Sequence, residues 1–135
     1  MALPLPMATA AIGQRDTSSR AEIVFVCEHG AAKSVIAAAY FNKLAAEKVL
    51  RERAIYRGAS PQAELSAATL NPITSDDVTS ATHIFAIGCS LPAHASSSGK
   101  ADSWDDVPEV TDGYAASRDA IKRYVERLIN QLQQR

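Results

Sequence analysis

The sequence contains few residues that would cross-link the chain or hold it in a membrane. Only two of its 135 residues are cysteine, which is too few for a disulfide scaffold. No stretch approaches the roughly 20 apolar residues that a membrane-spanning helix needs. The formal net charge is −1, so the sequence lacks the basic patch of a protein that binds nucleic acid or a membrane surface. We therefore expect no nucleic-acid partner, no membrane and a cytoplasmic location, where thiols stay reduced.

The sequence also lacks a metal-binding pattern. Its three histidines, His29, His83 and His94, are far apart, and none has the spacing to a cysteine that a zinc site needs. We expect neither a metal nor another cofactor. A length of 135 residues and a hydrophobic content of 47% suit one globular domain with its own core. Residues 1–20, rich in Ala, Pro, Ser and Thr, are expected to form a disordered extension, and residues 21–135 the domain.

Hydrophobic patterning predicts strands that alternate with helices. Residues 23–26 form a continuously apolar run, which is typical of a parallel strand buried on both faces. The alternation predicts an α/β fold, a small three-layer doubly wound parallel sheet. The other predicted elements, in chain order, are a helix over Ser34–Arg53, a strand over Ala54–Ala59, a weak helix over Pro61–Leu70, a turn at Asn71 and Pro72, a short helix capped by Thr74 or Ser75, a strand over His83–Gly88, a loop over Ser90–Ser103, a fourth strand or extended segment from Val107, and a helix over Asp112–Gln134.

The most informative segment is the loop that follows the first strand. Cys27 ends the apolar run, and Lys33 and Ser34 stand where the first long helix begins. Between a strand and a helix N-terminus, backbone N–H groups converge on an anion and the helix dipole favours negative charge. A thiol at such a position is favoured as the nucleophilic thiolate. An isolated cysteine would more often be a small buried apolar residue, but this context predicts attack on a phosphate-like anion.

The predicted oxyanion cradle is a run of seven residues. A glycine in its middle can adopt a positive φ without steric cost. The histidine is placed to hydrogen-bond an anion oxygen, whereas the glutamate opposes anion binding and is expected to face outward or to pair with a cation. The run consists of Glu28, His29, Gly30, Ala31, Ala32, Lys33 and Ser34.

Cys27, five intervening residues, Lys33 and Ser34, set between a strand and an Ala-rich helix, resemble the phosphate loop of the low-molecular-weight protein tyrosine phosphatases. The fold of that family includes the thiol-dependent arsenate reductases, and its pattern is Cys-x5-Arg-Ser/Thr. The resemblance implies a phosphatase that acts on a phosphate monoester, free or in a phosphoprotein, through a cysteinyl-phosphate intermediate. Lys33 departs from the pattern, because lysine offers a flexible point charge in place of a planar two-pronged guanidinium.

The resemblance also implies a general acid before the last helix, which the family usually provides in an Asp-Pro pair. No such pair occurs between residues 104 and 109. Asp105 and Asp106 are the substitutes, and Glu109 is the alternative if the loop is shifted. Solvated acidic residues near a helix start are an equally ordinary explanation. About 22 residues separate the second and third predicted strands, fewer than in the family, so the fold is expected to be shortened there.

Two further functions stay open at this stage. Cys89 ends the strand that neighbours the Cys27 strand in the family's order, so it is a candidate resolving thiol for arsenate reduction, with a small thiol or thioredoxin as the alternative partner. Ser96 stands where a third thiol of such reductases would be. A buried, unreactive Cys89 is as plausible from the sequence. The third function is a non-catalytic oxyanion-binding module, suggested by Lys33 and by the missing Asp-Pro pair.

Overall fold

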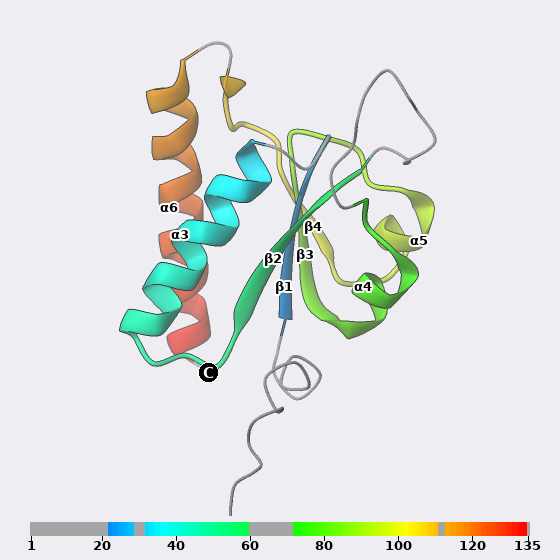
Figure 1. The fold of residues 1–135 in the computed structure, drawn as a ribbon, viewed down its shortest axis with the longest axis horizontal. Helices are drawn as coiled ribbons and strands as arrows, with labels where there is room; N and C mark the ends of the chain where they lie inside the picture. Colours follow the sequence, from blue (N-terminus) through cyan, green and yellow to red (C-terminus); the bar gives the residue numbers. More distant parts are fainter. Residues whose placement is uncertain (1–21, 29–31, 60–71, 111–112, 135) are drawn as a thin grey trace, which may run out of the picture.

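The computed structural model describes residues 22–28, 32–59, 72–110 and 113–134. Its centre is a four-stranded sheet with the strand order β2-β1-β3-β4, in which all neighbouring strands are parallel (Figure 1). The strands are β1 (Glu22–Cys27), β2 (Arg53–Gly58), β3 (Ala81–Ile87) and β4 (Ala101–Trp104). The helices are α3 (Lys33–Glu47), α4 (Ser75–Ser80), α5 (Ala93–Ser96) and α6 (Tyr114–Gln133).

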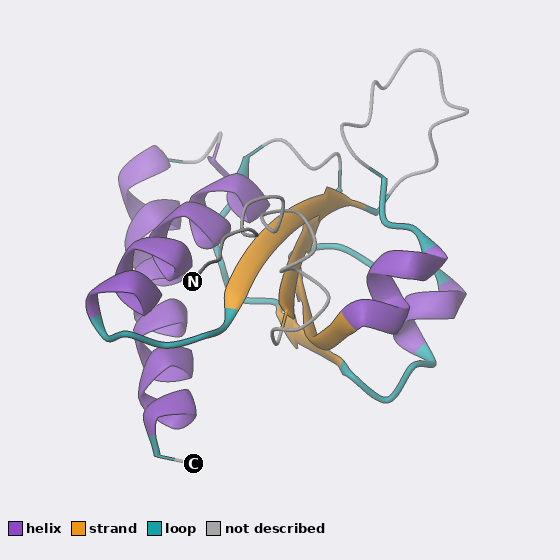
Figure 2. Cartoon of the chain, turned by 60° about the horizontal axis from the view of Figure 1, so that its bottom comes forward, coloured by secondary structure: helices purple, strands orange, loops and turns teal. Residues whose placement is uncertain are grey.

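The sheet lies between two layers of helices. Figure 2 shows the long helices α3 and α6 on one side of the strands and the short helices α4 and α5 on the other. This arrangement confirms the predicted three-layer parallel α/β fold. It also explains why β1 is apolar throughout, because successive side chains of a strand point to opposite faces and both faces are covered.

The two layers have different cores. Ile23 and Phe25 of β1 belong to the larger core, beneath α3 and α6. The ring of Phe25 lies 5.6 Å from that of Phe85 on β3 and 5.3 Å from that of Trp104 on β4, measured between centroids. Val24 and Val26 of β1 belong to the smaller core on the other face. There, burial is supplemented by a polar contact, in which Arg57 Nε of β2 donates to Asp77 Oδ2 of α4 at 2.8 Å.

Most of the predicted elements are found, with shifted ends. The helix predicted over Ser34–Arg53 ends at Glu47, because Val49 adopts a left-handed φ of 57° before the chain enters β2. The last helix begins at Tyr114 rather than at Asp112, and β3 covers Ala81–Ile87. The predicted cap at Thr74 is confirmed, since its hydroxyl accepts from Asp77 N at 3.1 Å.

The segment between β3 and α6 was predicted wrongly. The expected loop over Ser90–Ser103 contains α5 and most of β4, and the fourth strand begins at Ala101 rather than at Val107. A four-residue helix is too short to show an amphipathic period. β4 is an edge strand whose two central side chains, Asp102 and Ser103, are exposed, so it lacks the apolar run that marked the inner strands.

Several predictions fall outside the described residues. These are the extension over residues 1–20, the weak helix over Pro61–Leu70 and the first residue of the Asn71-Pro72 turn. Pro72 itself forms an isolated parallel bridge with Gly58 at the end of β2. Among the described helices, none combines the length and the apolar run that crossing a bilayer requires.

Candidate oxyanion site

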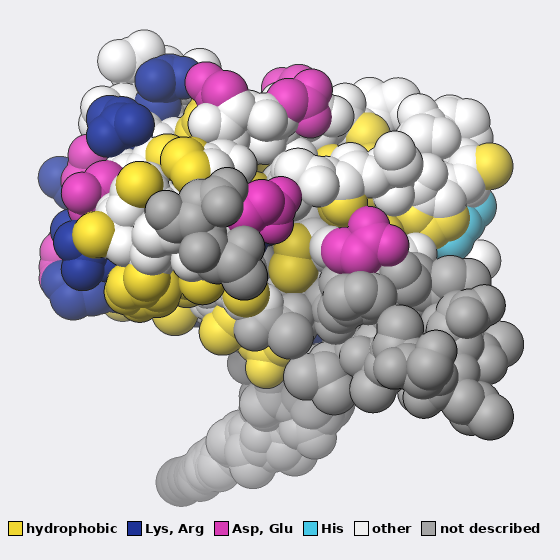
Figure 3. All heavy atoms as spheres, turned by 90° about the horizontal axis from the view of Figure 1, so that it is seen from above, with side chains coloured by type: hydrophobic (Ala, Val, Ile, Leu, Met, Phe, Trp, Pro, Cys, Tyr) yellow, Lys and Arg dark blue, Asp and Glu magenta, His cyan; other side chains and the backbone are white. Residues whose placement is uncertain are grey.

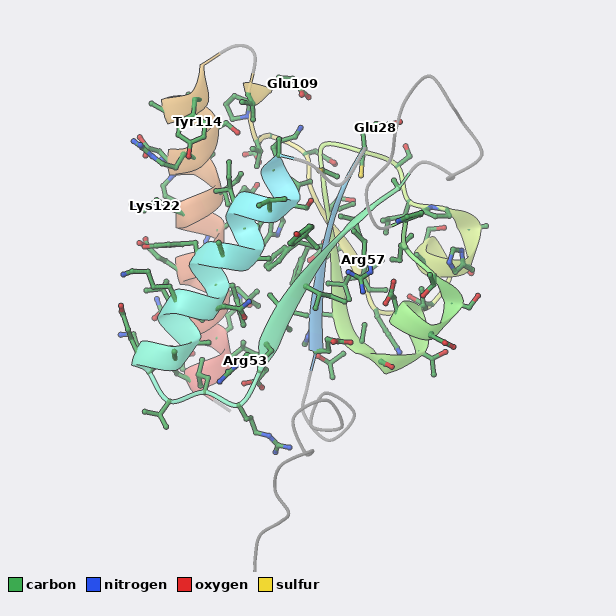
Figure 4. The ribbon with its side chains drawn as sticks, viewed as in Figure 1. Glu28, Arg53, Arg57, Glu109, Tyr114 and Lys122 are labelled. Carbon is green, nitrogen blue, oxygen red and sulfur yellow. The ribbon has the colours of Figure 1, made fainter. Side chains whose placement is uncertain are left out.

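Three loops meet at the carboxyl edge of the sheet, where ligands bind in open α/β folds. Cys27 is the last residue of β1, and Gly88 and Cys89 directly follow β3. Because β1 and β3 are neighbours, both cysteines end adjacent strands, as predicted. Figure 4 shows Glu28 and Glu109 at this same edge, on the loops that follow β1 and β4.

Cys27 is buried, with 4% of its surface exposed, and it contacts the start of α3. Its Sγ lies 3.1 Å from Ser34 Oγ, and the serine is completely buried. A hydroxyl at this distance can donate to a thiolate, and the positive end of the 15-residue helix α3 favours the same charge state. The predicted nucleophile and the last residue of the predicted cradle are therefore in contact.

Lys33, the first residue of α3, is a buried cation. Its side chain is 8% exposed, and Nζ donates to Glu109 Oε2 at 3.1 Å. On another side the ammonium group lies over Gly88, where a Cβ atom would be only 2.6 Å from Nζ. Gly88 also adopts a φ of +66°, a conformation that favours glycine. Gly88 thus leaves the space that the lysine occupies.

The three candidate acids have different surroundings. Asp106 accepts a hydrogen bond from the hydroxyl of Tyr124 on α6, and this bond, with burial, raises the pKa of Tyr124. Asp105 is exposed in the turn after β4. Glu109 was the alternative in the sequence prediction. Among the three acids and within the described residues, it is the one that contacts Lys33 of the oxyanion loop. Its carboxylate is 60% exposed.

Cys89 occupies a different environment from Cys27. Its thiol donates to Val26 O at 3.6 Å, and neither cysteine is in a disulfide. Burial, together with the nearby Cys27 and Glu28, raises the pKa of Cys89 to about 11, and the charge of Lys33 offsets only part of this. At neutral pH about one molecule in 10⁴ would carry the Cys89 thiolate. In this arrangement Cys89 is a poor attacking thiol.

The rest of the predicted cradle is only partly described. Glu28 is exposed, as expected, and its carbonyl accepts from Ala59 N at 3.1 Å. Ala32 precedes α3 and its carbonyl accepts from Ile36 N at 3.0 Å. His29, Gly30 and Ala31 lie outside the described residues. Within the described ranges, no group of histidine, cysteine and acidic side chains has the arrangement of a metal site.

Sequence reasoning missed two residues of this region. Gly88, which makes room for the lysine, carries only a weak signal, a glycine directly after a predicted strand. Tyr124, whose hydroxyl donates to Asp106, lies in the helix predicted over Asp112–Gln134, and nothing in the sequence linked it to residue 106. Both roles depend on contacts between distant parts of the chain.

No protein-family model and no curated protein matches the chain. Solved structures do. The chain is similar to YfkJ from Bacillus subtilis, with a TM-score of 0.71 and 20% identity over 86% of this chain and 96% of that one. It is also similar to the low-molecular-weight protein tyrosine phosphatase from T. tengcongensis, with a TM-score of 0.68 and 15% identity over 82% and 99%.

A third similar structure is a mutant of the YwlE arginine phosphatase, YwlE being a protein of Bacillus subtilis. Here the TM-score is 0.63 and the identity 21%, over 83% of this chain and 95% of that one. These matches span nearly the whole length of the known structures. At such low identity they establish the architecture, which agrees with the resemblance in the loop after β1. The chain has the fold of the low-molecular-weight protein tyrosine phosphatases.

Proposed function

We propose that this protein is a cysteine-dependent phosphatase that acts on a phosphate monoester. The observation that carries the proposal is the contact of 3.1 Å between Cys27 Sγ and Ser34 Oγ at the N-terminus of α3, where the preceding residue, Lys33, is a buried cation. A nucleophile, a hydroxyl that stabilises its thiolate, and a fixed cation are the groups that phosphoryl transfer to cysteine needs. The fold's phosphatase relatives support the same conclusion.

In the proposed reaction Cys27 Sγ attacks phosphorus in line with the leaving oxygen. The S–P bond forms as the P–O bond to the leaving group breaks, and an acid protonates the departing oxygen. Water then attacks phosphorus, the S–P bond breaks, and phosphate is released. In the YwlE mutant, where serine replaces cysteine, the active-site serine is phosphorylated. That covalent adduct supports the cysteinyl-phosphate intermediate for this chain.

Lys33 would neutralise the phosphoryl oxygens that the family's arginine holds. A lysine gives up the two-pronged geometry, but burial and Gly88 restrict where this ammonium can lie. An incoming phosphate would take the place of the Glu109 carboxylate on Lys33. The side chain of Glu109 is 60% exposed, so its carboxylate can move into water, and the phosphate would replace the negative charge that the buried ammonium of Lys33 needs.

We assign the role of general acid to Glu109, because the binding of phosphate would release its carboxyl group from Lys33. A general acid has to carry a proton, and after the exchange the Glu109 carboxyl group would lie beside the bound phosphate. The proton can then go to the leaving oxygen. Asp106 is engaged by Tyr124 instead. Asp105 stays the second candidate, since it is exposed in the same loop.

The acid assignment is tested with two leaving groups. Glu109→Gln should slow hydrolysis of an alkyl phosphate by about 10²-fold but that of p-nitrophenyl phosphate by less than about tenfold, because nitrophenolate leaves without a proton. Asp106→Asn is the matched control and should not discriminate between the two substrates. Selective loss in Asp106→Asn, with Glu109→Gln silent, would move the role to Asp106.

The function itself is tested by aryl phosphate hydrolysis in the wild type and in Cys27→Ser, with arsenate as a competitor. Turnover that disappears with the thiol is expected, and wild-type turnover in Cys27→Ser would overturn the proposal. Absent turnover in both, with arsenate still protecting Cys27 from alkylation, would favour arsenate reduction or a binding module. A reductase would then need a small thiol or thioredoxin, since Cys89 is held in its protonated form. The proposed cytoplasmic location rests on the two unbridged thiols.

A further inference from the structure

A groove of about 530 Å³ runs between the outer faces of α3 and α6. Its apolar lining comes from both helices, and Tyr114, at the start of α6, is 54% exposed. Among the described residues, Val49 is the other large apolar side chain with such exposure, and it does not line the groove. Apolar side chains that stay in water at a concave surface indicate a binding site more than they indicate packing. The apolar lining consists of Val35, Ile36, Ala39, Tyr40 and Tyr114.

Among the described residues, the charged lining of the groove is entirely basic. Lys43, Arg118 and Lys122 line it, and no acidic side chain of the described ranges does. The ammonium of Lys122 lies 5.2 Å from the ring centroid of Tyr40, and the guanidinium of Arg118 lies 5.8 Å from that of Tyr114. Figure 3 shows Lys and Arg side chains gathered beside apolar ones at the end of the molecule that α3 and α6 form. The chain as a whole has a net charge of −1, so this is a local property.

Acidic side chains lie next to this face, but their ion pairs with it are exposed. Lys43 pairs with Glu47 at 2.9 Å and Arg118 with Asp119 at 3.2 Å, but both pairs are exposed. Exposed pairs are weak and exchange their partners readily. Glu126 accepts a hydrogen bond from the Tyr40 hydroxyl at 2.7 Å, while Lys122 forms no ion pair with a carboxylate of the described residues. An incoming carboxylate can therefore replace the existing ones.

The groove begins next to the oxyanion site. The first turn of α3 carries Lys33 and Ser34 on its buried side, whereas Val35 and Ile36 line the groove. At a rise of about 1.5 Å per residue, the two features lie within about one helical turn along α3. Tyr114 begins α6 directly after the connection that carries Glu109, and Figure 4 shows the two residues at the same end of the molecule.

We propose that this groove binds the chain segment next to the phosphorylated residue of a protein substrate, and that this segment carries an apolar side chain flanked by acidic ones. The inference rests on the proposed function, because it names the substrate of that same site. The apolar side chain would pack on Tyr40 and Tyr114, and the acidic ones would meet Arg118 and Lys122. Aromatic contacts would give affinity, and the charges would select the sequence.

The test compares two phosphotyrosine peptides, one with leucine and glutamate on both sides and one with serine and lysine. Wild-type kcat/KM should favour the acidic peptide by about tenfold. In the double variant Arg118→Glu with Lys122→Glu, kcat/KM for the acidic peptide should fall about tenfold relative to that for p-nitrophenyl phosphate. The control variant, Lys48→Glu with Arg123→Glu, changes the charge equally outside the groove and should keep the preference.

The same variants separate this inference from the proposed function. If no substrate turns over, fluorescence anisotropy of the labelled, unphosphorylated peptides still reports the groove, and only the double variant should lose binding of the acidic one. Equal kinetics for both peptides, or equal losses in the two double variants, would overturn the inference while hydrolysis of p-nitrophenyl phosphate stands. Binding to anionic vesicles through Arg118 and Lys122, with no peptide preference, would overturn it in favour of a membrane surface.

Discussion

The carboxyl ends of β1 and β3 lie side by side, and each delivers a cysteine to the same edge of the sheet. Cys27 meets a buried hydroxyl at the positive end of a long helix. Cys89 follows a glycine turn, and its thiol donates a hydrogen bond to a backbone carbonyl, which favours the protonated thiol over the thiolate. The same position on neighbouring strands therefore produces two thiols with different chemistry.

This difference shows that the residues after a strand determine the chemistry of the groups at its carboxyl end. After β1 the chain starts α3, which supplies Ser34 and Lys33. After β3 the chain supplies Gly88, which serves the β1 side by leaving room for the lysine ammonium. One strand end carries the reactive groups, and the other shapes the space around them. The following predictions test that division.

The largest effect is expected from the cation on the β1 side. Lys33→Gln should lower kcat/KM for an aryl phosphate by about 10²–10³-fold, because a fixed charge beside the developing phosphoryl charge is lost. Lys33→Arg restores a cation, and its guanidinium can hold two oxygens, so it should retain or exceed wild-type activity. Steady-state kinetics with Lys48→Gln, an exposed lysine, as the control checks both. Equal rates for Lys33→Gln and the wild type would remove Lys33 from the site.

The reactivity of the β3 thiol gives the second comparison. Because burial raises the pKa of Cys89 to about 11, its thiolate forms only as the pH rises toward that value. In a Cys27→Ser variant, whose one remaining thiol is Cys89, iodoacetamide labelling at neutral pH should be about 10²-fold slower than in the same chain unfolded in urea. The rate should increase across the alkaline range. Labelling as fast as in urea would mean that Cys89 is available as a resolving thiol.

Gly88 is predicted to affect catalysis because the Lys33 ammonium occupies the space that a side chain at position 88 would fill. Gly88→Ala should reduce kcat/KM for an aryl phosphate by about thirtyfold, because the new Cβ would displace the lysine ammonium that the transition state needs. Gly99→Ala is the matched control, since Gly99 has a φ of +82° and no atom of the described residues lies within 4 Å of the added Cβ. Both variants should lose about 1 kcal/mol of unfolding free energy from backbone strain. Equal activity in the two would leave Gly88 a purely conformational role.

The sequence was sufficient for the parts of the molecule that depend on neighbouring residues. A continuous apolar strand, a short loop and a helix start are consecutive, so β1, Cys27, Lys33 and Ser34 were predicted together. α6 was predictable because its 20 residues repeat an apolar stripe. The edge strand β4 and the helix α5 were missed, since exposed or very short elements carry no clear period.

The contacts that complete the site come from distant residues. Lys33 and Glu109 are 76 positions apart in the sequence. The close approach of the lysine ammonium to Gly88 depends on the pairing of β1 with β3. Three acids lie within five residues, Asp105, Asp106 and Glu109, and the sequence does not distinguish their roles. Only the path of the loop over the sheet edge sends one toward Lys33 and another toward Tyr124 on α6. Spacing alone does not contain that path.

The smallest effect concerns two buried serines that differ only in their partners. Ser34 and Ser117 are both completely buried on long helices. Ser34 Oγ lies 3.1 Å from Cys27 Sγ, whereas Ser117 Oγ has no hydrogen-bond partner among the described residues. Ser34→Ala should lower kcat/KM about tenfold, because a hydrogen bond to a charged group contributes about 1.5–3 kcal/mol. Ser117→Ala removes the same atom and should leave kcat/KM unchanged.

Stability should respond in the opposite order. Removing the hydroxyl of Ser117 relieves a buried polar group that has no partner, so urea unfolding should show equal or higher stability. Removing the hydroxyl of Ser34 removes the contact of that residue with the Cys27 thiol and should cost stability only when the thiol is charged. An alkaline shift in the pH at which Cys27 reacts with iodoacetamide is therefore expected in Ser34→Ala and not in Ser117→Ala. An identical shift in both, or in neither, would mean that the serine at the start of α3 does not hold the thiolate.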